Sequence, residues 1–302
     1  MYFGLSEDQI FFQDNVKKFL EDQLTLDTVK KITEGEDDLA KEELHKGLIN
    51  LGINNILIPE EYGGLGLDLL FATAVSQSLG EGVATLPFLG PYIVAPTAIK
   101  YGASDNQKEK LFAGMCQNLI NFGIGFSEYF GSRDSSGLNI SDNKVTGKTL
   151  FVLDADFASH VMIADNKGQI GVVSLDSDGI EMIDLTTVDK TRTYKEMHFS
   201  DTPIEILDKT KSSSFAVEMA LDAGRIISAA DSLGASQAML NKAVEYSKER
   251  KQFNRVIGSF QAVKHMCAEM AAELEPCYSL VWHAAHSFDD SSEDARLMAC
   301  LA

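Results

Sequence analysis

Hydrophobic residues in the first third of the chain recur at intervals of three and four positions, which is the period of an amphipathic helix. The earliest such stripe consists of Phe11, Phe12, Val16, Phe19 and Leu20. The preceding segment Ser6-Glu-Asp-Gln9 has the form of a capping box, in which the serine hydroxyl and the glutamine amide satisfy free backbone groups at a helix start. We therefore expect a helix to begin there, and the same period predicts helices over residues 42–51, 69–80, 95–101 and 107–116.

From about Asn121 the pattern changes to short apolar runs divided by Gly, Asn and Asp, which is typical of strands and turns. The runs cover residues 122–126, 144–153, 161–164, 170–175 and 197–199. No amphipathic helix is predicted between them, so they favour an antiparallel barrel or sandwich over a parallel nucleotide-binding sheet.

Helical spacing returns after Ser212. Its two apolar stripes contain Leu233, Leu240 and Val244, and then Phe260, Val263, Cys267, Met270, Leu274 and Val281. They predict two helices paired as an antiparallel hairpin, and Ser291-Ser-Glu-Asp predicts the start of a third helix that reaches Ala302 without a stop signal. Such an arrangement leaves an apolar face uncovered. We expect either further C-terminal residues or a partner to cover it, and we favour the residues.

The pattern as a whole predicts an α+β multidomain protein. Residues 1–121 would form an N-terminal helical domain, residues 122–211 a middle antiparallel β-barrel or β-sandwich domain, and residues 212–302 a C-terminal helical bundle that is incomplete in this chain. A chain of 302 residues is long enough for two or three such units, since single hydrophobic cores stop growing near this length.

Composition narrows the possible functions. The net charge of −19 argues against nucleic acid or an anionic membrane surface as a partner, because both attract clusters of Lys and Arg. The four cysteines and six histidines are scattered without zinc-ligand spacing, so we expect reduced thiols and no metal site. Residues 1–20 have no uninterrupted apolar core, and we expect neither a signal peptide nor membrane insertion. We predict a cytoplasmic protein.

The most informative segment joins the two C-terminal helices and runs from Tyr246 to Gln261. Arg250 offers a planar fork of donors suited to pyrophosphate, and Gln252 and Gln261 offer amides for a hydroxyl or a purine edge. The alternative is that Arg250 and its neighbour Lys251 are solvated charges at a helix end, where cations favour the helix dipole.

This junction closely resembles a segment of the FAD-dependent acyl-CoA dehydrogenases, through Arg250-x-x-Phe253 and Ile257-Gly258-x-Phe260-Gln261. Asn254 stands where that family usually has Gly, but Asn also tolerates a left-handed turn. The resemblance implies that Arg250 binds the pyrophosphate of FAD and that Gln261 lies near the adenine side of a neighbouring subunit's cofactor. Phe253 and Ile257 would pack beside the adenine or ribose, although packing within the hairpin would explain them too.

Three weaker segments extend the resemblance. Pro59-Glu-Glu-Tyr-Gly-Gly-Leu-Gly-Leu67 looks like a family loop. The segment 127–134 is similar to the family's Thr-Glu-Pro-x-x-Gly-Ser-Asp, with Tyr129 in place of the proline. The resemblance implies backbone contacts from Phe126 and a hydroxyl contact from Ser127 to the flavin, and makes Ser132 a substrate-binding candidate. The alternative interpretation of this segment is a polar turn.

The third of these segments, residues 147–155, is similar to the family strand that lies against the flavin ring. Phe151 stands where Trp is usual, and it would keep an aromatic cover on the ring. Leu153 stands where Thr or Ser is usual, so a side-chain hydrogen bond to the ring would be lost. Both residues would also suit an ordinary buried strand.

The reaction that the resemblance implies needs a carboxylate to remove the α-proton of an acyl thioester while a β-hydride passes to the flavin. In most members that base lies beyond the point matching Ala302. In others it lies on the helix that here carries Gly224, and neither Asp222 nor Glu218 is a convincing substitute. Asp222 and Arg225 are substrate-binding candidates, Arg225 either through the coenzyme A portion or simply paired with Asp222.

The resemblance therefore predicts an FAD-dependent acyl-CoA dehydrogenase of fatty acid or lipid metabolism. Its partners would be an acyl-CoA substrate and an electron acceptor such as an electron-transfer flavoprotein, and it would form a homodimer, a homotetramer or a heterotetramer with a sister subunit. The alternative is a non-catalytic or half-site subunit of a heteromeric enzyme. An oxidase or other flavoenzyme on the same scaffold is a third possibility, since fold does not fix chemistry.

Overall fold

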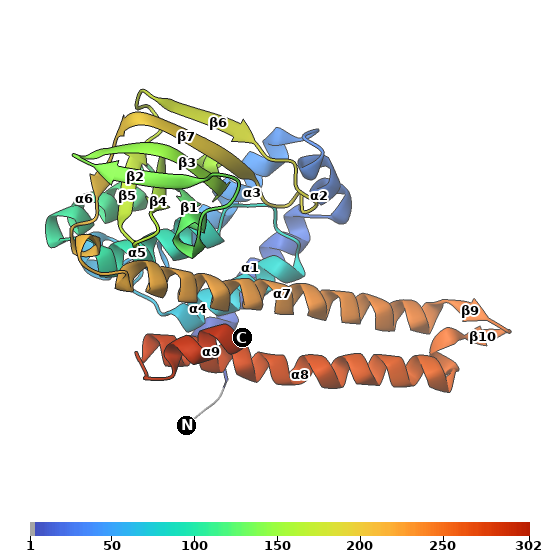
Figure 1. Ribbon diagram of the computed structural model, residues 1–302. Coiled ribbons are helices and arrows are strands. Elements are labelled where there is room, and N and C mark those ends of the chain that lie inside the picture. The colour runs from blue at the N-terminus through green and yellow to red at the C-terminus, as the bar shows by residue number, and fades with distance from the viewer. Residues whose placement is uncertain (1–3) are drawn as a thin grey trace. The chain divides into compact units, whose positions relative to one another are not determined.

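The computed structural model describes residues 4–302, which divide into two compact units (Figure 1). The first, called here the helical unit, comprises Met1–Val29, Leu69–Ala84 and Arg225–Ala302. The second, the sheet unit, comprises Lys30–Asp68 and Thr85–Gly224. Each unit gathers segments that are distant in sequence. The three consecutive domains expected from the sequence stay a prediction.

The helices lie close to the predicted ranges. Each of the predicted helices in the first third is present, with ends that shift by up to four residues. The α-helices are α1 (Glu7–Gln23), α2 (Leu26–Thr33), α3 (Asp38–Asn50), α4 (Leu69–Glu81), α5 (Ala95–Gly102), α6 (Asp105–Cys116), α7 (Phe215–Glu249), α8 (Gln261–Asp289) and α9 (Ala295–Leu301), and a π-helix, η3, covers Leu89–Val94.

The start of α1 confirms the predicted capping box. The Gln9 backbone amide donates to Ser6 Oγ at 3.2 Å, and the Ser6 amide donates to Gln9 Oε1 at 2.8 Å. Two amide groups that the helix itself cannot satisfy thus have partners.

Within the helical unit, α7 and α8 run antiparallel, as the sequence predicted (Figure 1). Ala230, Leu233 and Val281 form their shared buried cluster. Farther along the same helices, the stripe residues Leu240, Val244, Val263 and Cys267 are half-buried, and Met270 is 41% exposed. The two predicted stripes are therefore fully buried only near Leu233 and Val281.

Two glycines allow α4 and α7 to touch backbone to backbone. A Cβ on Gly234 would lie 1.9 Å from the Gln77 carbonyl oxygen, and a Cβ on Gly80 would lie 2.0 Å from the Asp231 carbonyl oxygen. No side chain fits at such distances, so this crossing requires glycine on both helices.

The sheet unit is built around one eight-stranded sheet with the order β6-β7-β3-β1-β4-β5-β8, and β2 pairs with β3. One face packs against α5, α6 and the first turns of α7 through residues such as Phe112, Phe122 and Met162. On the other side Val145, Val161 and other strand residues form a second core. The strands are β1 (Phe122–Gly125), β2 (Gly137–Ser141), β3 (Lys144–Leu153), β4 (His160–Ala164), β5 (Ile170–Ser174), β6 (Ile180–Asp184), β7 (Tyr194–Pro203) and β8 (Glu205–Ile206).

The expectation of an antiparallel barrel or sandwich needs correction, because the sheet is mixed. β1 and β4 pair in parallel, with Phe122 opposite His160, whereas the other recorded pairs are antiparallel. The strand order begins at β6 and ends at β8, and no pairing among residues 4–302 closes the sheet into a barrel. The parallel pair was missed because its crossover is the β2–β3 hairpin, where a sequence pattern leads one to expect a helix.

None of the helices within residues 4–302 is long and apolar enough to cross a membrane.

Candidate functional site

The junction between α7 and α8 folds as a small hairpin in the helical unit. β9 (Lys251–Gln252) pairs with β10 (Arg255–Val256), and Gln252 lies opposite Arg255. The two turn residues, Phe253 and Asn254, have φ values of 52° and 62°. Positive φ at both positions is the pattern of a type I′ turn, whose twist matches that of the flanking strands. The expectation that Asn254 supports a left-handed turn is confirmed.

The side chains of this hairpin project into solvent. Arg250 is exposed, and its guanidinium has no partner among the described residues; only its backbone bonds, with the Ile257 amide donating to the Arg250 carbonyl at 2.7 Å. Gln252 is also exposed and donates only to the neighbouring Lys251 carbonyl, at 2.8 Å. Gln261 is exposed at the start of α8. The junction thus presents the Arg250 guanidinium and the Gln261 amide without partners in the described part of the chain, and the Gln252 amide with a partner only in the adjacent residue.

Aromatic side chains stand beside these donors. Phe253 is 88% exposed and meets the edge of Phe260 at a centroid distance of 6.1 Å. The Arg255 guanidinium lies over the same Phe260 ring at 3.9 Å. Ile257 is half-buried in the turn that leads into α8. Phe253 is consequently free to stack on a planar ligand, while Phe260 is already covered on one face.

In the sheet unit, the loop after β1 is tied to β3 by a buried carboxylate. Glu128 is 2% exposed and accepts hydrogen bonds from the Leu150 amide at 2.9 Å and from the Thr149 hydroxyl. The Ser127 hydroxyl donates to the Leu150 carbonyl at 2.6 Å, with Glu128 as its other acceptor at 2.9 Å. Phe126 is buried, 4% exposed. The Ser127 proton is thus used within the protein, whereas the resemblance assigned this hydroxyl to the cofactor.

Strand β3 bulges where the resemblance places the flavin. Thr149 pairs with Met197 and Val152 with Lys195, so three steps along β3 match two along β7. The extra residue is a β-bulge, and such bulges re-aim side chains. Phe151 lies in it with φ 55° and is 46% exposed. Leu153 is half-buried and pairs with Ile124 of β1. The structure thus brings the Phe126–Ser127 loop and the Phe151–Leu153 segment onto neighbouring strands.

The three substrate-binding candidates, Ser132, Asp222 and Arg225, do not all lie on the same element. Ser132 is exposed in the loop before β2 and donates to the Ser136 carbonyl. Tyr129, at the position of the family's proline, donates to Glu218 Oε1 at 2.8 Å, which ties this loop to the start of α7. Asp222 is 4% exposed on α7, and Arg225 is half-buried and belongs to the helical unit.

Gly224 faces the π-helix η3. A Cβ placed on it would lie 3.3 Å from Val94 Cγ2 and 3.9 Å from Leu89 Cδ1. Glu218, one turn and a half earlier, is occupied by Tyr129 and by the Ser214 hydroxyl at 3.1 Å. No carboxylate in these positions of α7 is therefore free to act as a base.

Sequence reasoning missed Asp154, the residue that follows β3. It is 3% exposed, has φ 60°, and its Oδ2 has no hydrogen-bond partner among the described residues. Burial raises the pKa of Asp154 to about 7, and the nearby Arg192 charge and Gly90 backbone amide offset only part of that effect. An aspartate after an apolar strand ordinarily marks a surface turn, so the sequence carried no signal of its burial.

No group of three His, Cys, Asp or Glu side chains in the described part of the chain is arranged to bind a metal ion.

Two segments of the chain match models of known protein families. Residues 6–118 match the model of the acyl-CoA dehydrogenase N-terminal domain, and residues 215–302 match that of the acyl-CoA dehydrogenase C-terminal domain. Together these two matches cover most of the chain.

Individual relatives agree with the family models. The chain is 27% identical over 331 residues to the caffeyl-CoA reductase-Etf complex subunit CarC of Acetobacterium woodii, covering 100% of this chain and 84% of the relative. It is 28% identical over 312 residues to a short-chain-specific acyl-CoA dehydrogenase of Megasphaera elsdenii, covering 94% and 80%. The solved butyryl-CoA dehydrogenase of Megasphaera elsdenii superposes with a TM-score of 0.84 at 22% identity, covering 100% and 84%, which shows a shared fold.

Proposed function

The chain belongs to the acyl-CoA dehydrogenase family of oxidoreductases, and on that premise we propose that it binds FAD and catalyses α,β-desaturation of an acyl-CoA thioester. The reaction would belong to fatty acid or lipid metabolism in the cytoplasm. When bound, FAD supplies the acceptor for the β-hydride. The observation that carries the proposal is the exposed junction hairpin, with its unused donors beside an open aromatic ring.

The donor set of the hairpin fits a dinucleotide. A guanidinium offers parallel N–H groups to phosphate oxygens, and Arg250 has no competing partner in residues 4–302. Gln261 can bond a ribose hydroxyl or an adenine edge, and so can Gln252 through its carbonyl oxygen and the amide hydrogen that Lys251 does not take. Phe253 and Ile257 offer an apolar surface next to them. We assign these five residues to the pyrophosphate and adenine portion of FAD.

The sheet unit offers fewer groups that can contact FAD than the hairpin does. Phe151 can cover an aromatic ring system, because the bulge turns its side chain outward. Phe126 and Ser127 can contribute backbone groups, but the Ser127 hydroxyl already donates within the protein. Leu153 has no polar atom to offer. We assign these four residues to the isoalloxazine ring, held by shape and backbone polarity with little side-chain hydrogen bonding.

Substrate binding is assigned to Ser132, Asp222 and Arg225. Arg225 can bond a phosphate or carbonyl oxygen of the coenzyme A portion. The catalytic base is not assigned to a residue of α7, since Glu218 is occupied and Gly224 has no side chain. In line with the sequence resemblance, we propose that the base lies C-terminal to Ala302.

The proposal is tested with the visible absorbance spectrum of the purified protein after reconstitution with FAD, before and after anaerobic addition of acyl-CoA thioesters. Bound flavin that bleaches supports the dehydrogenase. No FAD binding by the protein, alone or with a co-expressed sister subunit, would contradict it.

The assignment of Arg250 has its own test. Arg250→Met is expected to weaken FAD binding by about tenfold or more, since a hydrogen bond to a charged group contributes about 1.5–3 kcal/mol. Lys251→Met is the matched control, because it removes the same charge from the adjacent exposed position. Equal losses in both variants would mean that only general charge matters and would remove Arg250 from the site.

A second candidate is a non-catalytic or half-site subunit of a heteromeric enzyme. Leu153 and the absence of a free carboxylate around Gly224 favour it. This subunit would bind FAD only together with a sister chain, or bind it without bleaching until the sister chain is added. We further propose that electrons leave to an electron-transfer flavoprotein, in keeping with the Etf complex named for the Acetobacterium relative, and that the protein is a homodimer, homotetramer or heterotetramer.

A further inference from the structure

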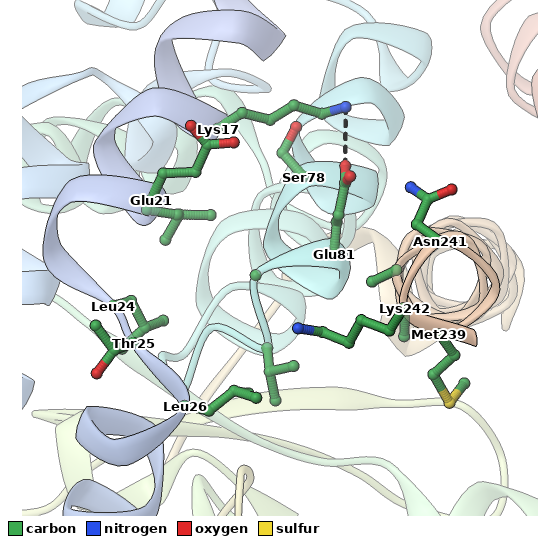
Figure 2. Close-up of a pocket in the computed structure, with 15 residues that line it drawn as sticks. Lys17, Glu21, Leu24, Thr25, Leu26, Ser78, Glu81, Met239, Asn241 and Lys242 are labelled. Atoms are coloured by element: carbon green, nitrogen blue, oxygen red, sulfur yellow. Dashed lines mark ion pairs between the residues drawn. The ribbon is translucent and has the colours of Figure 1, made fainter. Parts of the chain in front are cut away.

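The helical unit contains a cavity that shares no residue with the site assigned above. It has a volume of about 650 Å³ and lies between α1, the C-terminal end of α4 and the middle of α7 (Figure 2). This size is within the usual range of small-molecule pockets, about 300–1,000 Å³.

Most of the cavity wall is aliphatic. Its apolar side chains come from α1 and the residues that follow it up to the start of α2, from the turn after α4, and from α7: Leu20, Leu24, Leu26, Val83, Ala235, Ala238 and Met239. Three of these are open to water, with Leu26 60%, Met239 64% and Val83 36% exposed. Covering such a surface with a hydrocarbon chain would remove it from water, which is favourable by about 25 cal/mol per Å².

The turn that follows α4 is held in a costly conformation beside the cavity. Val83 has φ 53°, a value that a β-branched residue rarely adopts. Such strain costs on the order of 1–3 kcal/mol and concentrates at ligand sites, where the surrounding structure enforces it. The preceding Gly82 allows close packing, since a Cβ there would lie 3.0 Å from Leu20 Cδ1.

Two lysines and two glutamates line the same cavity, and they are not equivalent. Lys17 and Glu81 form an ion pair at 2.8 Å. Lys242 extends from α7 into the cavity, and no ion pair is recorded for its amine anywhere in residues 4–302 (Figure 2). Glu21 stands on α1, well apart from Lys242 in the same view. The charges thus leave one end of the cavity positive and the other negative.

We propose that this cavity binds an amphipathic monocarboxylate with a linear aliphatic chain. The chain lies against Leu20, Leu24 and Ala238, and the carboxylate pairs with Lys242. Glu21 repels an anionic head group and so orients the ligand with its head towards α7. A cationic amphiphile would have to lie the other way round, with its charge towards Glu21, and both it and a neutral amphiphile would leave the Lys242 amine without a partner.

The test is a calorimetric titration of the purified full-length protein with dodecanoate, dodecan-1-ol and dodecyltrimethylammonium, each below its micelle concentration. Dodecanoate is expected to bind more tightly than either of the other two. Equal binding of all three, or no binding of dodecanoate, would overturn the proposal.

Variants locate the site. Lys242→Met is expected to weaken dodecanoate binding about fivefold, the effect of losing an exposed ion pair, and to leave dodecan-1-ol unchanged. The matched control is Lys248→Met, which removes an α7 lysine that pairs with Glu245 outside the cavity. A Lys242→Met protein that binds dodecanoate as wild type does would overturn the proposal, as would equal losses in the two variants. The readout does not depend on FAD, so it stands apart from the test of the proposed enzyme.

Discussion

Glu128, which bonds to β3 at Thr149 and Leu150, and Asp154, which follows β3, are both almost fully withdrawn from water, at 2% and 3% exposed. Glu128 accepts from the Leu150 amide and from the hydroxyls of Thr149 and Ser127. Asp154 keeps one carboxyl oxygen without a partner, and its pKa is raised to about 7. Burial alone therefore does not decide whether a carboxylate stabilises or destabilises the folded state. The hydrogen-bond donors that reach its oxygens decide this.

The largest effect is expected for Glu128→Ala. Removing this carboxylate leaves the Leu150 amide and the Thr149 hydroxyl without their acceptor, whereas the Ser127 hydroxyl keeps the Leu150 carbonyl. At about 1–3 kcal/mol for each of the two orphaned buried groups, we expect the free energy of unfolding to fall by about 4 kcal/mol.

Urea unfolding followed by circular dichroism measures this loss. Glu128→Gln serves as the control, because it keeps one acceptor oxygen and should lose less. If Glu128→Ala lowered the free energy of unfolding by less than about 1 kcal/mol, the hydrogen bonds to Glu128 would not stabilise the fold, and the contrast with Asp154 would be wrong.

The next effect concerns Asp154 and pH. The folded protein holds a proton on this carboxyl up to about pH 7, whereas the unfolded chain releases it near pH 3.8. The folded state therefore binds more protons between these values, and the free energy of unfolding falls as pH rises through this window. At 1.36 kcal/mol per pH unit over about three units, Asp154 should account for about 4 kcal/mol of that fall.

Asp154→Asn should remove this part of the pH dependence. At pH 8 the variant should be more stable than wild type by about 2 kcal/mol, which is the 4 kcal/mol gained less about 2 kcal/mol for burying an unpaired amide. Unfolding curves collected from pH 4 to pH 8 test this. Asp156→Asn is a useful contrast, because desolvation there is outweighed by Lys195 together with Thr193 and Lys41, which lowers the pKa of Asp156, so its pH dependence has the opposite sign. Parallel curves for wild type and Asp154→Asn would refute the assignment.

The smallest effect is expected when one of the hydrogen-bond donors to Glu128 is removed. Thr149→Val keeps the shape of the side chain and removes one hydrogen bond to Glu128. We expect the free energy of unfolding to fall by about 1–3 kcal/mol, as for a bond to a charged group. Combined with Glu128→Ala in a double-mutant cycle, the losses should not add, since both variants break the same bond. Additive losses would show that Thr149 acts through some other contact.

Local chemistry allowed much of the helical structure to be predicted. The capping box at Ser6 marks the start of α1, and the three- and four-residue period marks α4 and α8, because both signals depend on neighbours within a few positions. The left-handed turn at Asn254 is predictable for the same reason. The range 144–153 was predicted as a strand and is β3.

The sequence also contained the family resemblance, through the side chains of the Arg250 to Gln261 junction. The sequence could not show which of the polar side chains would form hydrogen bonds within the protein and which would stay available to a ligand. Arg250 is left without a partner, while the Ser127 hydroxyl is bonded to the Leu150 carbonyl twenty-three residues away. Both residues are polar and lie outside the α-helices and strands, so only their surroundings distinguish them.

The sequence by itself thus determined the order of helical and strand-rich segments, the caps and turns, and the residues that carry the family resemblance. The tertiary structure decided the parallel pairing of β1 with β4, the bulge that turns Phe151 outward, and the burial of Asp154. The physical reason is the range of the interactions. Caps and helical periods are satisfied within a turn of chain, whereas strand register, desolvation and the sharing of hydrogen bonds depend on segments that meet only when the chain has folded.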